Sequence, residues 1–189
     1  RRRLLAKADA LCEGAEKVAY RMSHGGRDAF LGAGTGNGGG YYADALLRSY
    51  WLTGAQKYLD YACLNADFQL GCNPLSKSFV TGMGARPPRR PMISRQLFRP
   101  GRPYDPYSAV KGFTVYGLAA KFGNRAHPAP LPPWRRWPDL WGAGAMISSE
   151  FTIHQTIGPS AMLHAALYAL EKESPGRPAV GNPEVKGKP

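Results

Sequence analysis

Between residues 41 and 70 the apolar side chains recur at helical spacing in two runs, interrupted only by Thr53-Gly54. Gly54 fits the left-handed position that often ends a helix, and Thr53 with Gln56 has the spacing of a capping box for a second helix. Two apolar helices joined by so short a connection pack antiparallel, which predicts an αα-hairpin over residues 41–52 and 54–70. The second helix is expected to end at Gly71, because Pro74 follows it closely.

Two further segments have helical spacing, one near each end of the chain. Residues 2–22 repeat apolar side chains from Leu4 to Met22, and Ser23-His24-Gly25-Gly26 is typical of a helix end. A last helix is expected from Gly158-Pro159 to about Glu171. It is apolar almost all round, so it is expected to be buried.

The region between these helices is rich in proline. Residues 96–147 contain eight prolines, which exclude a long uninterrupted helix there and predict long loops. Flat aromatic faces suit the C–H faces of sugar rings, so the aromatic residues of these loops could form a saccharide platform, but packing of the loops is the favoured interpretation for any single one. Among these aromatics are Tyr104, Tyr107, Phe113, Tyr116, Trp134, Trp137 and Trp141. The pattern as a whole predicts an all-α domain with long loops.

Composition narrows the classes of function. The chain has 189 residues, 43% apolar and 20% charged, which is typical of one globular domain. No apolar run reaches the length of a membrane span, so no membrane partner is expected. The net charge is +12, and 16 of the 25 basic residues are Arg, which could attract nucleic acid. Because the arginines lie with prolines in loops rather than along one helix, solvated surface is the favoured interpretation.

The residues that bind metals and cofactors form no convincing pattern. Cys12, Cys63 and Cys72 lack metal-ligand spacing and are interpreted as small buried apolar residues. The four histidines add no ligand set, so no metal is expected. Gly34, Gly36 and Gly39 match the dinucleotide fingerprint, with Asp60 downstream, but no strand precedes them. We therefore expect no cofactor.

One carboxylate stands in a distinctive setting, at Ser149-Glu150-Phe151-Thr152-Ile153-His154-Gln155-Thr156-Ile157-Gly158-Pro159. Taken alone, a Glu near a helix start is usually a solvated residue favoured by the helix dipole. This segment, however, resembles the final motif of the family 9 glycoside hydrolases. Leu52-Thr53-Gly54, Leu70-Gly71-Cys72-Asn73-Pro74-Leu75 and Phe79-Val80-Thr81-Gly82-Met83-Gly84 resemble earlier motifs of that family in the same order. The resemblance covers roughly residues 40–172.

The resemblance implies a fold and a reaction. Residues 1–173 would be the C-terminal portion of an (α/α)6 six-hairpin barrel. The tail, residues 174–189, is predicted to be disordered from its prolines, glycines and charges rather than from the resemblance. Glu150 would be the general acid of an inverting glycosidase, endo- or exo-acting, on a β-linked glucan or related oligosaccharide. Where the family carries His-His-Arg or His-x-Arg, this chain has Arg89 to Arg95. Arg95 would therefore contact substrate, while the missing His leaves the glucan specificity open.

The catalytic base is the part of the mechanism that the chain does not supply. The family takes it from an Asp-rich motif nearer the N-terminus, whereas the Asp residues here stand singly. The chain also begins at Arg1 without Met. We therefore expect a fragment, inactive alone, whose partner is the remaining N-terminal part of the same catalytic domain. A non-catalytic saccharide-binding remnant and, less favoured, a basic nucleic-acid-binding module are the alternatives.

Overall fold

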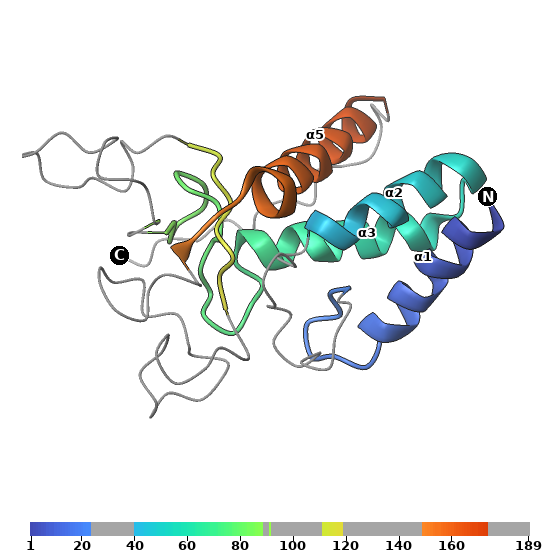
Figure 1. The fold of residues 1–189 in the computed structure, drawn as a ribbon, viewed down its shortest axis with the longest axis horizontal. Coiled ribbons are helices and arrows are strands. Elements are labelled where there is room, and N and C mark those ends of the chain that lie inside the picture. The colour runs from blue at the N-terminus through green and yellow to red at the C-terminus, as the bar shows by residue number, and fades with distance from the viewer. Residues whose placement is uncertain (24–39, 89–90, 92–110, 119–148, 174–189) are drawn as a thin grey trace, which may run out of the picture.

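The computed structural model describes residues 1–23, 40–88, 91, 111–118 and 149–173. They form four α-helices, α1 (Arg2–Ala15), α2 (Gly40–Thr53), α3 (Gln56–Leu70) and α5 (Gly158–Glu173), and a π-helical turn, η3 (Ile153–Ile157). Helix α2 packs against α1, α3 and α5 (Figure 1). Extended pairing within these ranges is limited to one antiparallel bridge between Val80 and Thr114, so the expected all-α class is confirmed.

The predicted hairpin is present as α2 and α3. Gly54 closes α2 with φ +69°, and its N–H donates to the carbonyl of Tyr50 over 2.7 Å. The predicted capping box is wrong. The Thr53 hydroxyl instead donates back to the carbonyl of Ser49 over 2.7 Å and accepts from the N–H of Ala55 over 3.2 Å. Thr53 therefore stabilises the turn between the helices, and α3 begins at Gln56 without a side-chain cap.

The first helix is shorter than predicted. It ends at Ala15 rather than near residue 22, and the chain continues in turns with bonds from Lys17 N–H to Gly14 and from Val18 N–H to Ala15. Gly14 is a weak helix former, which favours an end at this point. Val18 and Met22 are nevertheless buried. The apolar spacing therefore reflects burial by tertiary packing that continues after the helix has ended.

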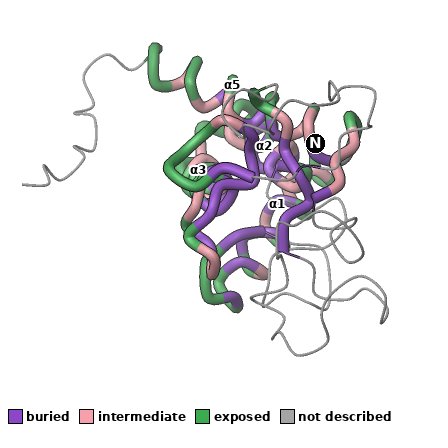
Figure 2. The backbone as a smooth tube through the Cα atoms, turned by 90° about the vertical axis from the view of Figure 1, so that its left-hand side faces the viewer, coloured by how far each residue is buried: buried purple, intermediate pink, exposed green. Residues whose placement is uncertain are grey.

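The last helix begins where predicted, but its expected burial is wrong. Only Ser160, Leu163 and Ala166 of α5 are buried, while Met162 is 39% and Tyr168 61% exposed. The reason is that α5 packs against α2 and α3 along one side. Figure 2 shows the exposed residues on α5 beyond that contact.

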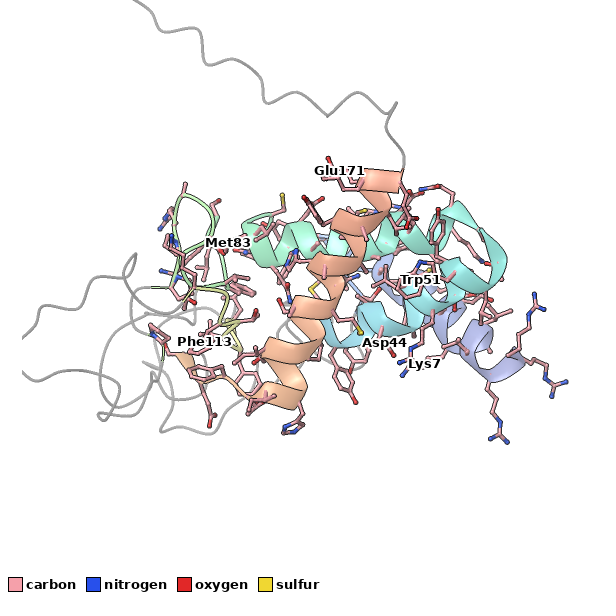
Figure 3. All side chains as sticks on the ribbon, turned by 90° about the horizontal axis from the view of Figure 1, so that it is seen from above. Lys7, Asp44, Trp51, Met83, Phe113 and Glu171 are labelled. Carbon is pink, nitrogen blue, oxygen red and sulfur yellow. The ribbon has the colours of Figure 1, made fainter. Side chains whose placement is uncertain are left out.

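Two groups of apolar side chains form the core. The helical cluster joins the four helices, and its buried members are Ala8, Leu11, Cys12, Ala43, Ala45, Leu46, Leu47, Tyr58, Ala62, Ala66, Leu163 and Ala166. The loop cluster consists of Met22, Phe68, Phe79, Val115 and Leu118, with Leu75 and Phe151 packed against it. Figure 3 places Met83 and Phe113 at the loop end of the molecule, far from Trp51 and Lys7 at the opposite end.

The helices that the structure describes include none with both the length and the apolar character needed to cross a bilayer.

Candidate active site

The backbone of Glu150 is tied to helix α3 through two loop segments. The N–H of Phe79 donates to the carbonyl of Gln69 near the end of α3, over 2.7 Å. The N–H of Val115 donates to the carbonyl of Phe79 over 2.9 Å, and the N–H of Tyr116 donates to the carbonyl of Glu150 over 2.9 Å. Three segments distant in sequence therefore hold Glu150 at the loop end of the molecule.

The first of these loops is shaped by the Asn-Pro-Leu motif. The buried Asn73 amide donates to the carbonyls of Phe68 and Lys77, over 2.8 and 2.7 Å. Its oxygen accepts from the N–H groups of Leu75 and Lys77, over 3.1 and 3.4 Å. An Asn is well suited to this role because it offers both donors and acceptors on a short side chain. Asn73 therefore sets the path of the chain from α3 towards Phe79.

A π-helical turn begins three residues after Glu150. In η3 the N–H of Ile157 donates to the carbonyl of Thr152 over 3.0 Å. The buried Thr156 hydroxyl closes the same turn, donating to the Thr152 carbonyl over 2.9 Å and accepting from the Thr152 N–H over 3.0 Å. Single π-helical turns are frequent at functional sites.

Apolar residues support the Glu150 segment from one side. Phe151 is half-buried against the loop cluster, and its ring stacks on Phe113 with the centroids 4.9 Å apart. Ile153, two residues further on, is by contrast 78% exposed.

Glu150 as a residue is half-buried. In the parts of the chain that the structure describes, no side chain forms a hydrogen bond or an ion pair with it, whereas Asp9, Asp44 and Asp60 all have such partners on the helix surfaces. Glu150 is thus held through its backbone, and its carboxyl group is left for other contacts.

Several predicted features lie outside the described residues. They are Arg95, the glycine pattern Gly34, Gly36 and Gly39, most of the aromatic residues of the proline-rich region, and the tail 174–189. Of the aromatics, Phe113 and Tyr116 are described. Phe113 stacks on Phe151 and Tyr116 is only 5% exposed, so both follow the packing interpretation.

The sequence did not single out the buried polar cluster that joins α3 to α5. The Gln69 carbonyl oxygen Oε1 accepts from Ser160 Oγ over 2.9 Å and lies 2.9 Å from His164 Nε2, which must therefore carry the proton. Burial lowers the pKa of His164, against the opposing charge of Asp67, and burial raises the pKa of Asp67. A polar Gln within an apolar helix was the available signal.

The cysteines differ from one another. Cys12 is buried as expected, and burial raises the pKa of its thiol to about 11. For Cys63 and Cys72 the expectation of burial is wrong, because both are exposed. Among the described side chains, no group of three or more His, Cys, Asp and Glu residues could hold a metal ion.

Three solved structures are similar to this chain. A metagenome-derived glycoside hydrolase family 9 endoglucanase matches with a TM-score of 0.64 and 23% identity, over 89% of this chain and 28% of its own. AaCel9A in complex with cellobiose-like isofagomine matches with a TM-score of 0.63 and 24% identity, over 88% and 30%. A Bacteroides ovatus GH9 protein matches with a TM-score of 0.60 and 24% identity, over 88% and 27%.

No protein-family model and no curated protein matches the chain. The structural matches span less than a third of each similar protein. At identities below 25% they bear on the fold alone. The chain therefore has the fold of a part of the (α/α)6 barrel found in family 9 glycoside hydrolases.

Proposed function

We propose that this chain supplies the general acid, Glu150, of an inverting glycoside hydrolase that acts on a β-linked glucan or related oligosaccharide. Inversion needs a carboxylic acid to protonate the leaving oxygen and a carboxylate to activate water on the opposite face of the sugar. The observation that carries the proposal is the position of Glu150. Glu150 is half-buried and held by its backbone, its carboxyl has no polar partner among the described residues, and it lies three residues before the start of η3 in a family 9-like fold.

The catalytic base belongs, in this proposal, to a separate part of the same domain. The similar structures are more than three times as long as the part that this chain matches. The exposed side of α5, with Met162 and Tyr168, is consistent with a neighbour that packs there. Arg95 would contact the substrate through its planar fork of donors. AaCel9A was solved with a cellobiose-like ligand, which suggests cello-oligosaccharides as the first substrates to try.

The decisive experiment replaces Glu150 by Gln in a polypeptide that joins this chain to the rest of the proposed domain. Gln keeps the shape but cannot transfer a proton, so the rate on an unactivated glycoside should fall by about two to four orders of magnitude. An aryl glycoside with a good leaving group needs less protonation and should lose much less. Binding should change little, because the loss falls on the transition state.

Glu171→Gln is the matched control, since Glu171 is an exposed carboxyl near the end of α5 (Figure 3). It should leave both rates unchanged. A near-normal rate of the Glu150→Gln variant on the unactivated glycoside would remove Glu150 from the mechanism. Equal losses on both substrates would instead point to a structural role.

A second candidate is saccharide binding without catalysis. It is favoured by the four aspartates of the described helices. Asp9, Asp44 and Asp60 are bonded to helix-surface neighbours and Asp67 interacts electrostatically with His164, so none is shown as a base paired with Glu150. Titration of the 189-residue chain with a cello-oligosaccharide at two ionic strengths tests it. Binding of a neutral sugar should barely respond to salt, whereas affinity for nucleic acid should fall steeply. Hydrolysis by the chain alone would contradict the need for a separate base.

A further inference from the structure

Tyr116 contacts the chain on both sides of Phe151. Its backbone N–H donates to the carbonyl of Glu150 over 2.9 Å, and its hydroxyl lies 3.3 Å from the hydroxyl of Thr152, with either group able to donate. The two contacts come from one residue and reach two positions separated by a single residue. They therefore restrain both the position and the direction of the Glu150 segment.

Tyr116 is buried outside the two apolar clusters of the described residues. The side chain is 5% exposed, yet Tyr116 belongs to neither the helical cluster nor the loop cluster. Its neighbour Val115 fills the loop cluster instead. A buried Tyr usually has a partner for its hydroxyl, and here that partner includes Thr152.

Thr152 passes the restraint on to the turn that follows. Its backbone N–H and carbonyl are both bonded to the Thr156 hydroxyl, over 3.0 and 2.9 Å. The Tyr116 hydroxyl is thus linked, through Thr152, to the start of η3. Loss of that hydroxyl would remove one of the two contacts described between Tyr116 and this segment, with less restraint on the turn after it.

We propose that Tyr116 is a positioning residue for the Glu150 carboxyl, acting through its hydroxyl on Thr152. This rests on the proposed function of Glu150 as the acid. A proton is transferred only when the two heavy atoms approach within about 2.6–3.2 Å, so a small displacement of the acid slows the reaction. At 3.3 Å the contact between the hydroxyls is long, so about a tenfold effect is expected rather than a hundredfold one.

The first test uses the 189-residue chain itself and measures amide hydrogen exchange at residues 150–152. Tyr116→Phe and Thr152→Val each remove one hydroxyl of the pair. Each should speed exchange about tenfold, and the double variant should go no further, because both changes break the same contact. Unchanged exchange in Tyr116→Phe, or effects that multiply in the double variant, would overturn the proposal.

Thr114→Val provides the matched control. The buried Thr114 hydroxyl has no hydrogen-bond partner among the described residues, and it lies two residues from Tyr116 in the same segment. Its removal should leave exchange at residues 150–152 unchanged, since no interaction is lost. Faster exchange in this variant would mean that any disturbance of the segment loosens Glu150, which would also overturn the specific role of Tyr116.

The second test measures catalysis in the polypeptide that joins this chain to the rest of the proposed domain. Tyr116→Phe should lower kcat on an unactivated glycoside about tenfold, lower it much less on an activated one, and leave KM within about twofold. Equal losses on both substrates would indicate a merely structural role and overturn the proposal. Failure of Glu150 as the acid is detected separately, by a near-normal rate of Glu150→Gln on the unactivated glycoside.

Discussion

The helical cluster and the loop cluster are both buried, but they are assembled in different ways. The helical cluster takes its side chains from regularly spaced positions on four helices, of which α2 and α3 are joined by a short turn at Gly54. The loop cluster gathers residues as distant as Met22 and Leu118, all but Phe68 from segments outside the helices, which backbone hydrogen bonds such as that from Val115 to Phe79 join. Glu150 is therefore held by the loop cluster, the region whose structure depends least on local sequence patterns.

The largest expected effect comes from truncation of a large side chain in the loop cluster. Phe79→Ala should lower the free energy of unfolding by about 3–5 kcal/mol, because the fully buried ring of Phe79 packs edge-on against Phe68. The matched change in the helical cluster, Leu46→Ala, should cost about 2–5 kcal/mol. Urea unfolding monitored by circular dichroism measures both.

The two variants should differ locally. Phe79→Ala should also speed exchange of the Tyr116 amide, whose partner is Glu150, while Leu46→Ala should not do so beyond its effect on global unfolding. The two variants are compared at urea concentrations that give them the same free energy of unfolding. If both then speed exchange of the Tyr116 amide equally, the two clusters unfold as one cooperative unit and the distinction between them fails.

An intermediate effect is expected from two glycines with positive φ, one in each region. Gly117 has φ +75°, and a Cβ there would lie 2.8 Å from the Phe79 ring. Gly117→Ala should therefore cost about 2–4 kcal/mol, the sum of left-handed strain and crowding. Gly54→Ala, with φ +69° and open space around it, should cost only about 1–2 kcal/mol, from the strain alone. Equal losses, measured by thermal unfolding, would show that contact with Phe79 adds nothing.

The smallest effect is expected from pH, at the polar cluster between the two regions. Burial lowers the pKa of His164 below its ordinary value of 6.5 in the folded chain, so below about pH 6.5 the unfolded chain binds more protons. The free energy of unfolding should therefore be unaffected by His164 above about pH 6.5 and should decrease as the pH falls from that value through the lowered pKa of the folded chain. His164→Gln should flatten the decrease, and the exposed His154→Gln should not.

Asp67, whose charge interacts with His164, affects stability at lower pH and in the opposite direction. Its raised pKa means that the folded chain holds the proton more tightly, so stability should decrease as the pH rises from 3.8.

Urea unfolding at about pH 7.5 and at about pH 5.5 tests the contribution of His164. A decrease that persists unchanged in His164→Gln would assign the pH dependence to another group.

The site was predictable only in part. Glu150 stood out through its resemblance to a family motif, and its role stays a prediction, while Arg95 lies outside the described residues. Tyr116 was noted as one aromatic among several, because nothing in its own neighbourhood indicates a bond to Glu150. That bond joins Tyr116, within the proline-rich region, to a residue beyond the end of that region, and no local pattern encodes such a pairing.

The sequence by itself determined the all-α class, the αα-hairpin and the start of the last helix, because helical spacing and turn residues act over a few positions. It did not determine where α1 ends, since Val18 and Met22 keep the helical spacing while the chain leaves the helix. Nor did it determine which side of α5 stays exposed, or which segments hold the backbone of Glu150. Those were decided by the tertiary structure, because burial and long-range hydrogen bonds depend on which segments meet in space.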